Sequence, residues 1–161
     1  MRTMMAICAL WALSVAASLG QAADSSTKPL TDNEIQLLRS DVQAAKNDII
    51  AHTMQFADAE SNAFWPVYRD YARDQHVIGD KRLQLIKDYA QAYESMSDAN
   101  ARDMMQRMLN IDDEILNLRE DYWPKFEKAL GAKRAAKFYQ VDSLLTLLIN
   151  LELTSEIPLI P

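Results

Sequence analysis

The stretch FADAESNAFWPVY, residues 56–68, contains the start of a helix and the beginning of its apolar side. Phe56 is an apolar residue placed just before the helix, Asp58 is either its cap or a first-turn acid, and Glu60 lies near the positive end of the helix dipole. Phe64 and Tyr68 are four residues apart, so they share one side of that helix. The stretch therefore predicts a long amphipathic helix.

Three further stretches of similar form predict three more helices. LTDNE at Leu30 combines an apolar residue, a capping threonine and a glutamate, and MSDANA at Met96 offers Ser97 as N-cap. LGAKRA at Leu130 places Gly131 where one helix ends and the next begins. The predicted helices cover residues 31–54, 58–95, 98–129 and 132–156.

Few turn-forming residues interrupt this pattern, with 3 glycines and 5 prolines in 161 residues. The second helix would span on the order of 55 Å at 1.5 Å per residue, longer than a compact bundle of this size easily covers. We therefore predict an all-α fold of four long helices in an elongated, kinked helical-hairpin arrangement. An antiparallel dimer would cover the remaining apolar sides.

The N-terminal sequence MRTMMAICALWALSVAASLGQAA, residues 1–23, is typical of a signal peptide. Arg2 precedes an apolar stretch shorter than the ~20 residues of a membrane span, and small residues follow it, which disfavours the alternative of a membrane anchor. We expect cleavage after Ala22 or Ala23 and a periplasmic location. Cys8, the single cysteine, lies within this segment, so the mature chain would contain no thiol.

The remainder of the chain is predicted to form one domain. Residues 24–29 are small and polar and are expected to be a flexible leader. Residues 30–157 are predicted to form a single helical domain, and residues 158–161 an apolar tail laid on its surface. No stable membrane span is expected, because the apolar run LLTLLINLEL in the fourth helix is too short and too polar.

Composition and motifs argue against several classes of function. A formal charge of -6 disfavours nucleic acid, whose phosphates require a basic face. The Glu-x-x-His motif of carboxylate metal centres is absent, and His52 and His76 are interpreted as ordinary core or surface residues. Met104, Met105 and Met108 are interpreted as core filler, and no residue set indicates catalysis. We therefore predict no enzyme activity, no cofactor and no metal ligand.

Two aromatic pentapeptides, FWPVY at Phe64 and YWPKF at Tyr122, place a proline inside a predicted helix. Each would bend its helix, and we interpret both as packing corners in preference to ligand sites. Gly79, in the middle of the second helix, is expected to allow a neighbouring backbone to come close. The aromatic and leucine side chains predicted to contact a partner or client are Phe64, Trp65, Tyr68, Trp123, Phe126, Leu144, Leu148 and Leu151.

An exported, cysteine-free chain of four helices that opens with LTDNE resembles the Spy/CpxP-type (LTxxQ-motif) periplasmic proteins. FADAE and MSDAN depart further from the motif, so a related group of exported helical proteins is the alternative. The resemblance implies an antiparallel helical dimer, shaped like a cradle, that acts as an ATP-independent chaperone or as a damper of envelope-stress signalling. The basic concave face usual in that family contrasts with the acidic composition of this chain.

Three functions remain open from the sequence. The first is a non-enzymatic periplasmic protein, chaperone-like or a binding module of the envelope-stress response, that shields unfolded or envelope clients with apolar helix faces. The second is a metal-responsive accessory protein of the periplasm, suggested by His52, His76 and the acidic residues around Asp112. The third is a structural homodimer that docks a partner protein.

Overall fold

The computed structural model describes residues 32–155 and 157–160, and within these the side chains of residues 40–151 and 157–160. The chain divides into two units, Met1–Arg39 and Ser40–Pro161. The first unit contributes helical backbone from residue 32 onward, so the packing below is that of the second unit. The predicted signal peptide, the leader and the capping residues Leu30 and Thr31 lie outside the described residues.

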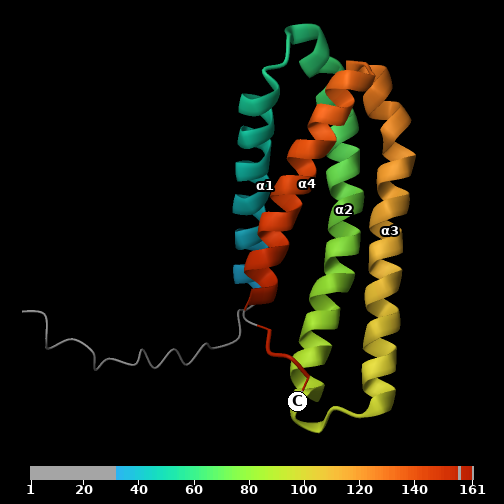
Figure 1. Ribbon diagram of the computed structural model, residues 1–161. Helices are drawn as coiled ribbons and strands as arrows, with labels where there is room; N and C mark the ends of the chain where they lie inside the picture. Colours follow the sequence, from blue (N-terminus) through green and yellow to red (C-terminus); the bar gives the residue numbers. More distant parts are fainter. Residues whose placement is uncertain (1–31, 156, 161) are drawn as a thin grey trace, which may run out of the picture. The chain divides into compact units, whose positions relative to one another are not determined.

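The described residues form four α-helices and no strand, which confirms the predicted all-α class (Figure 1). The helices are α1 (Asp32–Met54), α2 (Asp58–Ala92), α3 (Asp98–Leu130) and α4 (Ala132–Ser155), and a 3-10 turn, η1 (Tyr93–Ser95), follows α2. Each observed start lies within one residue of the predicted one. Short connections between the helices make successive helices antiparallel.

Local hydrogen bonds explain where the helices begin and end. The Glu60 carboxylate accepts the backbone N–H of Ala57 at 3.0 Å, so Ala57 is the N-cap of α2 and Asp58 is a first-turn acid. Ser97 Oγ accepts the backbone N–H three residues further on, at 3.2 Å, as the predicted cap of α3. Gly131 adopts φ +75° and donates its N–H to the Glu127 carbonyl at 2.8 Å, which ends α3 as predicted.

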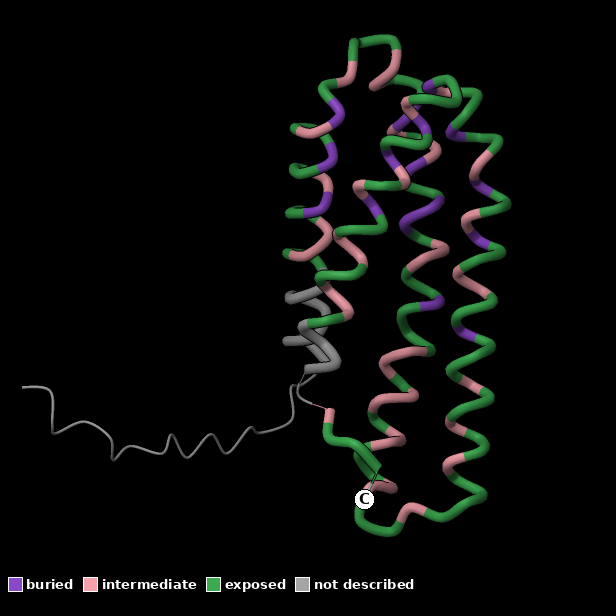
Figure 2. The backbone as a smooth tube through the Cα atoms, in the orientation of Figure 1, coloured by how far each residue is buried: buried purple, intermediate pink, exposed green. Residues whose placement is uncertain are grey.

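The buried residues gather close to the α1–α2 and α3–α4 connections (Figure 2), and many of them are aromatic. Phe138 of α4 is fully buried, with its ring centroid 4.5 Å from that of Phe126 and 5.0 Å from that of Phe64. The buried core residues are Ile50, Met54, Phe64, Tyr68, Tyr71, Ala72, Ile78, Ile111, Leu118, Tyr122, Phe126, Leu130, Ala135 and Phe138. By contrast, residues 79–110, at the other end of α2 and α3, contain no buried side chain.

The two proline-containing pentapeptides pack against each other inside this core. Phe64 opens the first, Phe126 closes the second, and their ring centroids lie 5.5 Å apart. Pro66 and Pro124 lie within α2 and α3, and both helices continue past them. The interpretation of these sequences as packing elements agrees with the burial of Phe64 and Phe126.

Gly79 is an interior residue of α2. The predicted close approach of a backbone to Gly79 is wrong, because nothing lies within 4 Å of the position that a Cβ would take there.

The C-terminal tail, of which residues 157–160 are described, has no regular structure and exposes 89% of Leu159. The Tyr89 hydroxyl donates a hydrogen bond of 2.6 Å to the Pro158 carbonyl and anchors the tail to α2.

Candidate functional site

The second half of α4 carries four exposed leucines on one side, which we call the leucine face. The exposed fractions are 62% for Leu144, 64% for Leu147, 62% for Leu148 and 63% for Leu151. Spacings of three and four residues place all four side chains along one stripe of the helix. Residues 143–151 contain no charged side chain, so nothing within this stretch offsets its apolar character.

The opposite side of α4 packs into the core. Ala135, Phe138 and Asp142 are buried there, and Leu145 packs against the same cluster. The α4 helix is therefore apolar on two sides, and the core of its own unit covers one of them. Complete burial of a leucine side chain contributes about 1.5–3 kcal/mol, so the uncovered side offers a partner a substantial gain.

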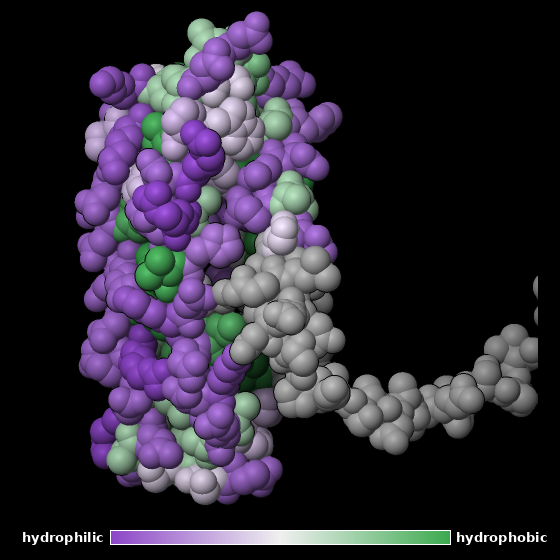
Figure 3. All heavy atoms as spheres, turned by 180° about the vertical axis from the view of Figure 1, so that it is seen from behind, coloured by the Kyte–Doolittle hydropathy of each residue, from purple (hydrophilic) through white to green (hydrophobic). Residues whose placement is uncertain are grey.

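Exposed apolar side chains also occur on the other helices, where on α3 charged residues such as Arg107 and Asp112 lie among them. On α3 they are Met105, Met108, Leu109 and Leu116. The face of the molecule in Figure 3 is mostly hydrophilic, with apolar residues scattered among polar ones. The absence of a charged residue between its four leucines therefore distinguishes α4 from α3.

A buried polar network joins α1, α2 and α4 on the core side of α4. Lys46 Nζ lies 3.2 Å from Asp142 Oδ1 and donates a second hydrogen bond, of 3.0 Å, to Gln75 Oε1. The Tyr71 hydroxyl donates to Asp142 Oδ2 at 2.8 Å. Burial and the neighbouring Asp142 carboxylate raise the pKa of Tyr71 well above its ordinary value.

This network has the character of a structural link. Asp142 and Tyr71 are fully buried and Lys46 is 6% exposed, so a substrate has no path to the carboxylate. Each charged group has a partner, which is the condition under which charges persist in a protein interior. The network fixes how three helices meet, and it leaves the exposed side of α4 unaffected.

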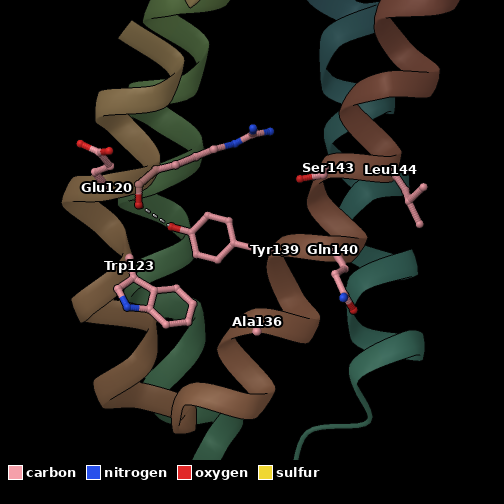
Figure 4. Close-up of a pocket in the computed structure, with 8 residues that line it drawn as sticks. Glu120, Trp123, Ala136, Tyr139, Gln140, Ser143 and Leu144 are labelled. Carbon is pink, nitrogen blue, oxygen red and sulfur yellow. Dashed lines mark hydrogen bonds between the residues drawn. The ribbon is translucent and has the colours of Figure 1, made fainter. Parts of the chain in front are cut away.

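An open groove of about 780 Å³ runs between α3 and α4 (Figure 4). Its walls are formed by Arg119, Glu120, Trp123, Ala136, Tyr139, Gln140, Ser143 and Leu144. The Tyr139 hydroxyl donates to the Arg119 carbonyl at 2.9 Å and ties the two helices together at its base. Because Leu144 also belongs to the leucine face, the groove opens directly onto it.

The predicted contact residues fall into three groups. Phe64, Tyr68 and Phe126 are buried and at most 2% exposed, so they face the interior of their own unit. Trp65 and Trp123 are half-buried at its margin. The predicted leucines Leu144, Leu148 and Leu151 are exposed together on the leucine face.

Sequence reasoning missed four residues that matter to these sites: Leu147, Arg119, Lys46 and Asp142. Leu147 follows Leu144 by three residues, and that spacing was available in the sequence. Lys46 and Asp142 lie 96 residues apart in the chain, so nothing local indicated that they form an ion pair.

The two histidines and the acidic clusters, which suggested a metal-responsive protein, do not gather into a metal-binding group in the part of the chain that the structure describes. His52 on α1 and His76 on α2 are both exposed. Asp112 and Glu114 form ion pairs with Arg82 and Lys81 of α2. The described helices also include none whose length and apolar content would suit a membrane crossing.

Comparisons with known proteins add no relative to this description. No family model matches the chain, no curated protein matches it, and no solved structure matches its fold.

Proposed function

We propose that this protein is a non-enzymatic binding protein of the periplasm that shields apolar protein segments, in the manner of a chaperone. The observation that carries the proposal is the leucine face, four leucines each more than 60% exposed on one side of α4. Contiguous exposed apolar side chains on a soluble protein mark surfaces for interaction. The aromatic core and the buried network support the helix that presents them.

A protein client suits this surface better than a small molecule. The leucine face is an exposed helix side of about two turns, and of its four side chains Leu144 alone lines the groove between α3 and α4. Unfolded segments bury leucine, phenylalanine and valine side chains against such a stripe without needing one fixed sequence. The absence of charge between residues 143 and 151 removes a source of selectivity and favours broad binding.

The test measures light scattering while a chemically unfolded apolar test protein is diluted from denaturant with an equimolar amount of this protein. We expect suppression of scattering by the wild type. Leu148→Asp removes one leucine and puts a charge at the centre of the face, so we expect client binding to weaken by about 2 kcal/mol, roughly thirtyfold. Leu109→Asp, at a 47% exposed leucine on α3, is the matched control and retains suppression.

Sedimentation of the same three proteins distinguishes a client surface from a self-association surface. If the wild type is a dimer, fails to suppress scattering, and dissociates when Leu148→Asp is introduced, the face binds a second copy and the proposal is wrong. Equal suppression by Leu148→Asp and the wild type contradicts it as well. Circular dichroism of each variant establishes that the helices are retained.

A further inference from the structure

The groove between α3 and α4 contains a positive charge that lacks a partner within the described residues. Arg119 Nε is enclosed without a hydrogen-bond partner, and none of the ion pairs found there includes this side chain. Its charge lies close enough to Tyr71 and Tyr139 to oppose the effect of burial on the pKa of each hydroxyl. An arginine in such a position normally pairs with a carboxylate or phosphate.

Neither the acid that lines the groove nor the acid that acts on the same two tyrosines forms an ion pair with this guanidinium. The Asp142 carboxylate, which acts on the same two tyrosines, is already bonded to Lys46 and to the Tyr71 hydroxyl. Glu120 lines the groove but is exposed, and its side chain points away from Tyr139 and α4 (Figure 4). Among the described residues, the positive charge of Arg119 in this groove therefore has no ion-pair partner.

The rest of the groove is suited to an apolar chain. The Trp123 and Tyr139 rings form one wall with their centroids 5.9 Å apart, and Ala136 leaves the floor open. From Ala136 to Ser143 the groove follows α4 for about 10 Å at 1.5 Å per residue. Gln140 and Ser143 add hydrogen-bond donors on the α4 wall, and Leu144 extends the apolar surface. The volume is within the range of small-molecule sites.

We propose that this groove binds a long-chain carboxylate, with the headgroup on Arg119 and the acyl chain against Trp123, Tyr139 and Leu144. A charge beside an apolar trough matches an amphiphile that has one anionic head. A peptide would need partners for its backbone N–H and C=O groups along the whole trough, whereas the polar side chains on its α4 wall, apart from the Tyr139 hydroxyl that already bonds the Arg119 carbonyl, are Gln140 and Ser143. This site uses Arg119 and the groove, so it holds whether or not the leucine face binds protein.

The test titrates the purified protein with decanoate in a calorimeter, below the concentration at which decanoate forms micelles. Decanol and decyltrimethylammonium have the same chain with a neutral or a positive head, and acetate has the same head without the chain. We expect saturable 1:1 binding of decanoate, binding of decanol at least about tenfold weaker, and no measurable binding of acetate or the cation. Added salt is expected to weaken the binding of decanoate and to leave that of decanol unchanged.

Variants locate the site. Arg119→Gln is expected to weaken decanoate binding at least about tenfold without affecting decanol, whereas Arg119→Lys retains most of the affinity. Ala136→Trp, at an exposed position, fills the groove and is expected to abolish binding of both ligands. Arg73→Gln, at an exposed arginine of α2 that pairs with Asp70 and Asp74, is the matched control and leaves both affinities unchanged.

Three outcomes would overturn the proposal: no decanoate binding by the wild type, equal binding of decanoate and decanol, or decanoate binding unchanged by both Arg119→Gln and Ala136→Trp. If Arg119→Gln fails to fold, Ala136→Trp and the comparison of headgroups decide the matter on folded protein. Leu148→Asp separates this site from the proposed client surface. Loss of client binding with decanoate affinity retained shows two sites.

Discussion

The two ends of the helical unit are stabilised in different ways. At one end, near the α1–α2 and α3–α4 connections, rings from three helices pack with centroid separations as short as 4.5 Å. At the other end, residues 79–110 of α2 and α3 bury no side chain and are joined by ion pairs such as Arg107–Asp88, at 2.7 Å. The hydrogen bond from Arg107 lowers the pKa of Asp88, a sign of a specific pair at a half-buried position.

This difference indicates where the stability of the unit is concentrated. Exposed ion pairs contribute little individually, and salt screens them, whereas buried aromatic side chains each contribute several kcal/mol. The end with the buried rings of Phe64, Phe126 and Phe138, which we call the aromatic end, therefore holds the first half of α4 in place. The leucine face lies on the second half of α4. A helix that is packed in its first half and exposes apolar side chains in its second half is suited to binding variable partners.

The largest expected effect comes from Phe138→Ala at the aromatic end. Phe138 is fully buried among Phe64, Tyr68 and Phe126, so its removal leaves a cavity and is expected to lower the free energy of unfolding by about 4 kcal/mol. The matched change Leu109→Ala, on α3 within residues 79–110, is expected to cost less than about 1 kcal/mol. Urea unfolding followed by circular dichroism measures both, and comparable losses would contradict the contrast between the two ends.

The parts of this fold that the sequence predicted are those decided by nearby residues. Caps and helix stops depend on atoms three or four residues apart, as in the hydrogen bonds of Glu60, Ser97 and Gly131. The helix boundaries were accordingly predicted to within one residue at each start. The aromatic pentapeptides were assigned to packing for the same reason, since helical spacing alone places Phe64 and Phe126 on apolar sides.

The parts that could not be predicted depend on contacts distant in the chain. α4 is apolar on both sides, and periodicity does not tell which side meets the core. Within this chain the side with Phe138 is buried and the side with Leu148 is exposed. The unpaired state of Arg119 likewise depends on where Asp142 finds its partners.

The second prediction concerns the buried ion pair that links α1 to α4. Asp142→Asn keeps the shape and an acceptor for the Tyr71 hydroxyl but leaves the buried Lys46 ammonium without its counter-charge. We expect the free energy of unfolding to fall by about 3 kcal/mol, because an unpaired buried charge costs far more than a buried pair. Urea midpoints at neutral pH provide the measurement.

The double variant Lys46→Met with Asp142→Asn distinguishes charge imbalance from lost packing. Removing both charges is expected to recover most of the loss, since an apolar side chain replaces the ammonium without leaving a buried ion. If Asp142→Asn leaves the free energy of unfolding unchanged, the pair is solvated and does not fix the approach of α1 to α4. If the double variant is as unstable as the single one, packing and not charge accounts for the effect.

The third prediction concerns a loss of stability at alkaline pH that originates at the aromatic end. Burial raises the pKa of Tyr68 to about 12, and burial together with Asp142 raises the pKa of Tyr71 further. Above pH ~10 the unfolded chain releases these protons while the folded chain keeps them, so the free energy of unfolding falls by up to about 1.4 kcal/mol per pH unit for each tyrosine. For Tyr68 the loss lies between pH ~10, the pKa in the unfolded chain, and about 12.

Tyr68→Phe isolates this contribution from the titration of lysines, which both proteins share. The hydroxyl of Tyr68 accepts a hydrogen bond of 3.2 Å from Gln43, so its removal is expected to cost about 1 kcal/mol at neutral pH. Above pH ~10 the variant should lose stability less steeply than the wild type, because it has one fewer buried group to titrate. Urea midpoints measured across this range give the two slopes, and parallel slopes would mean that Tyr68 is open to solvent and that the aromatic end is looser than its ring packing indicates.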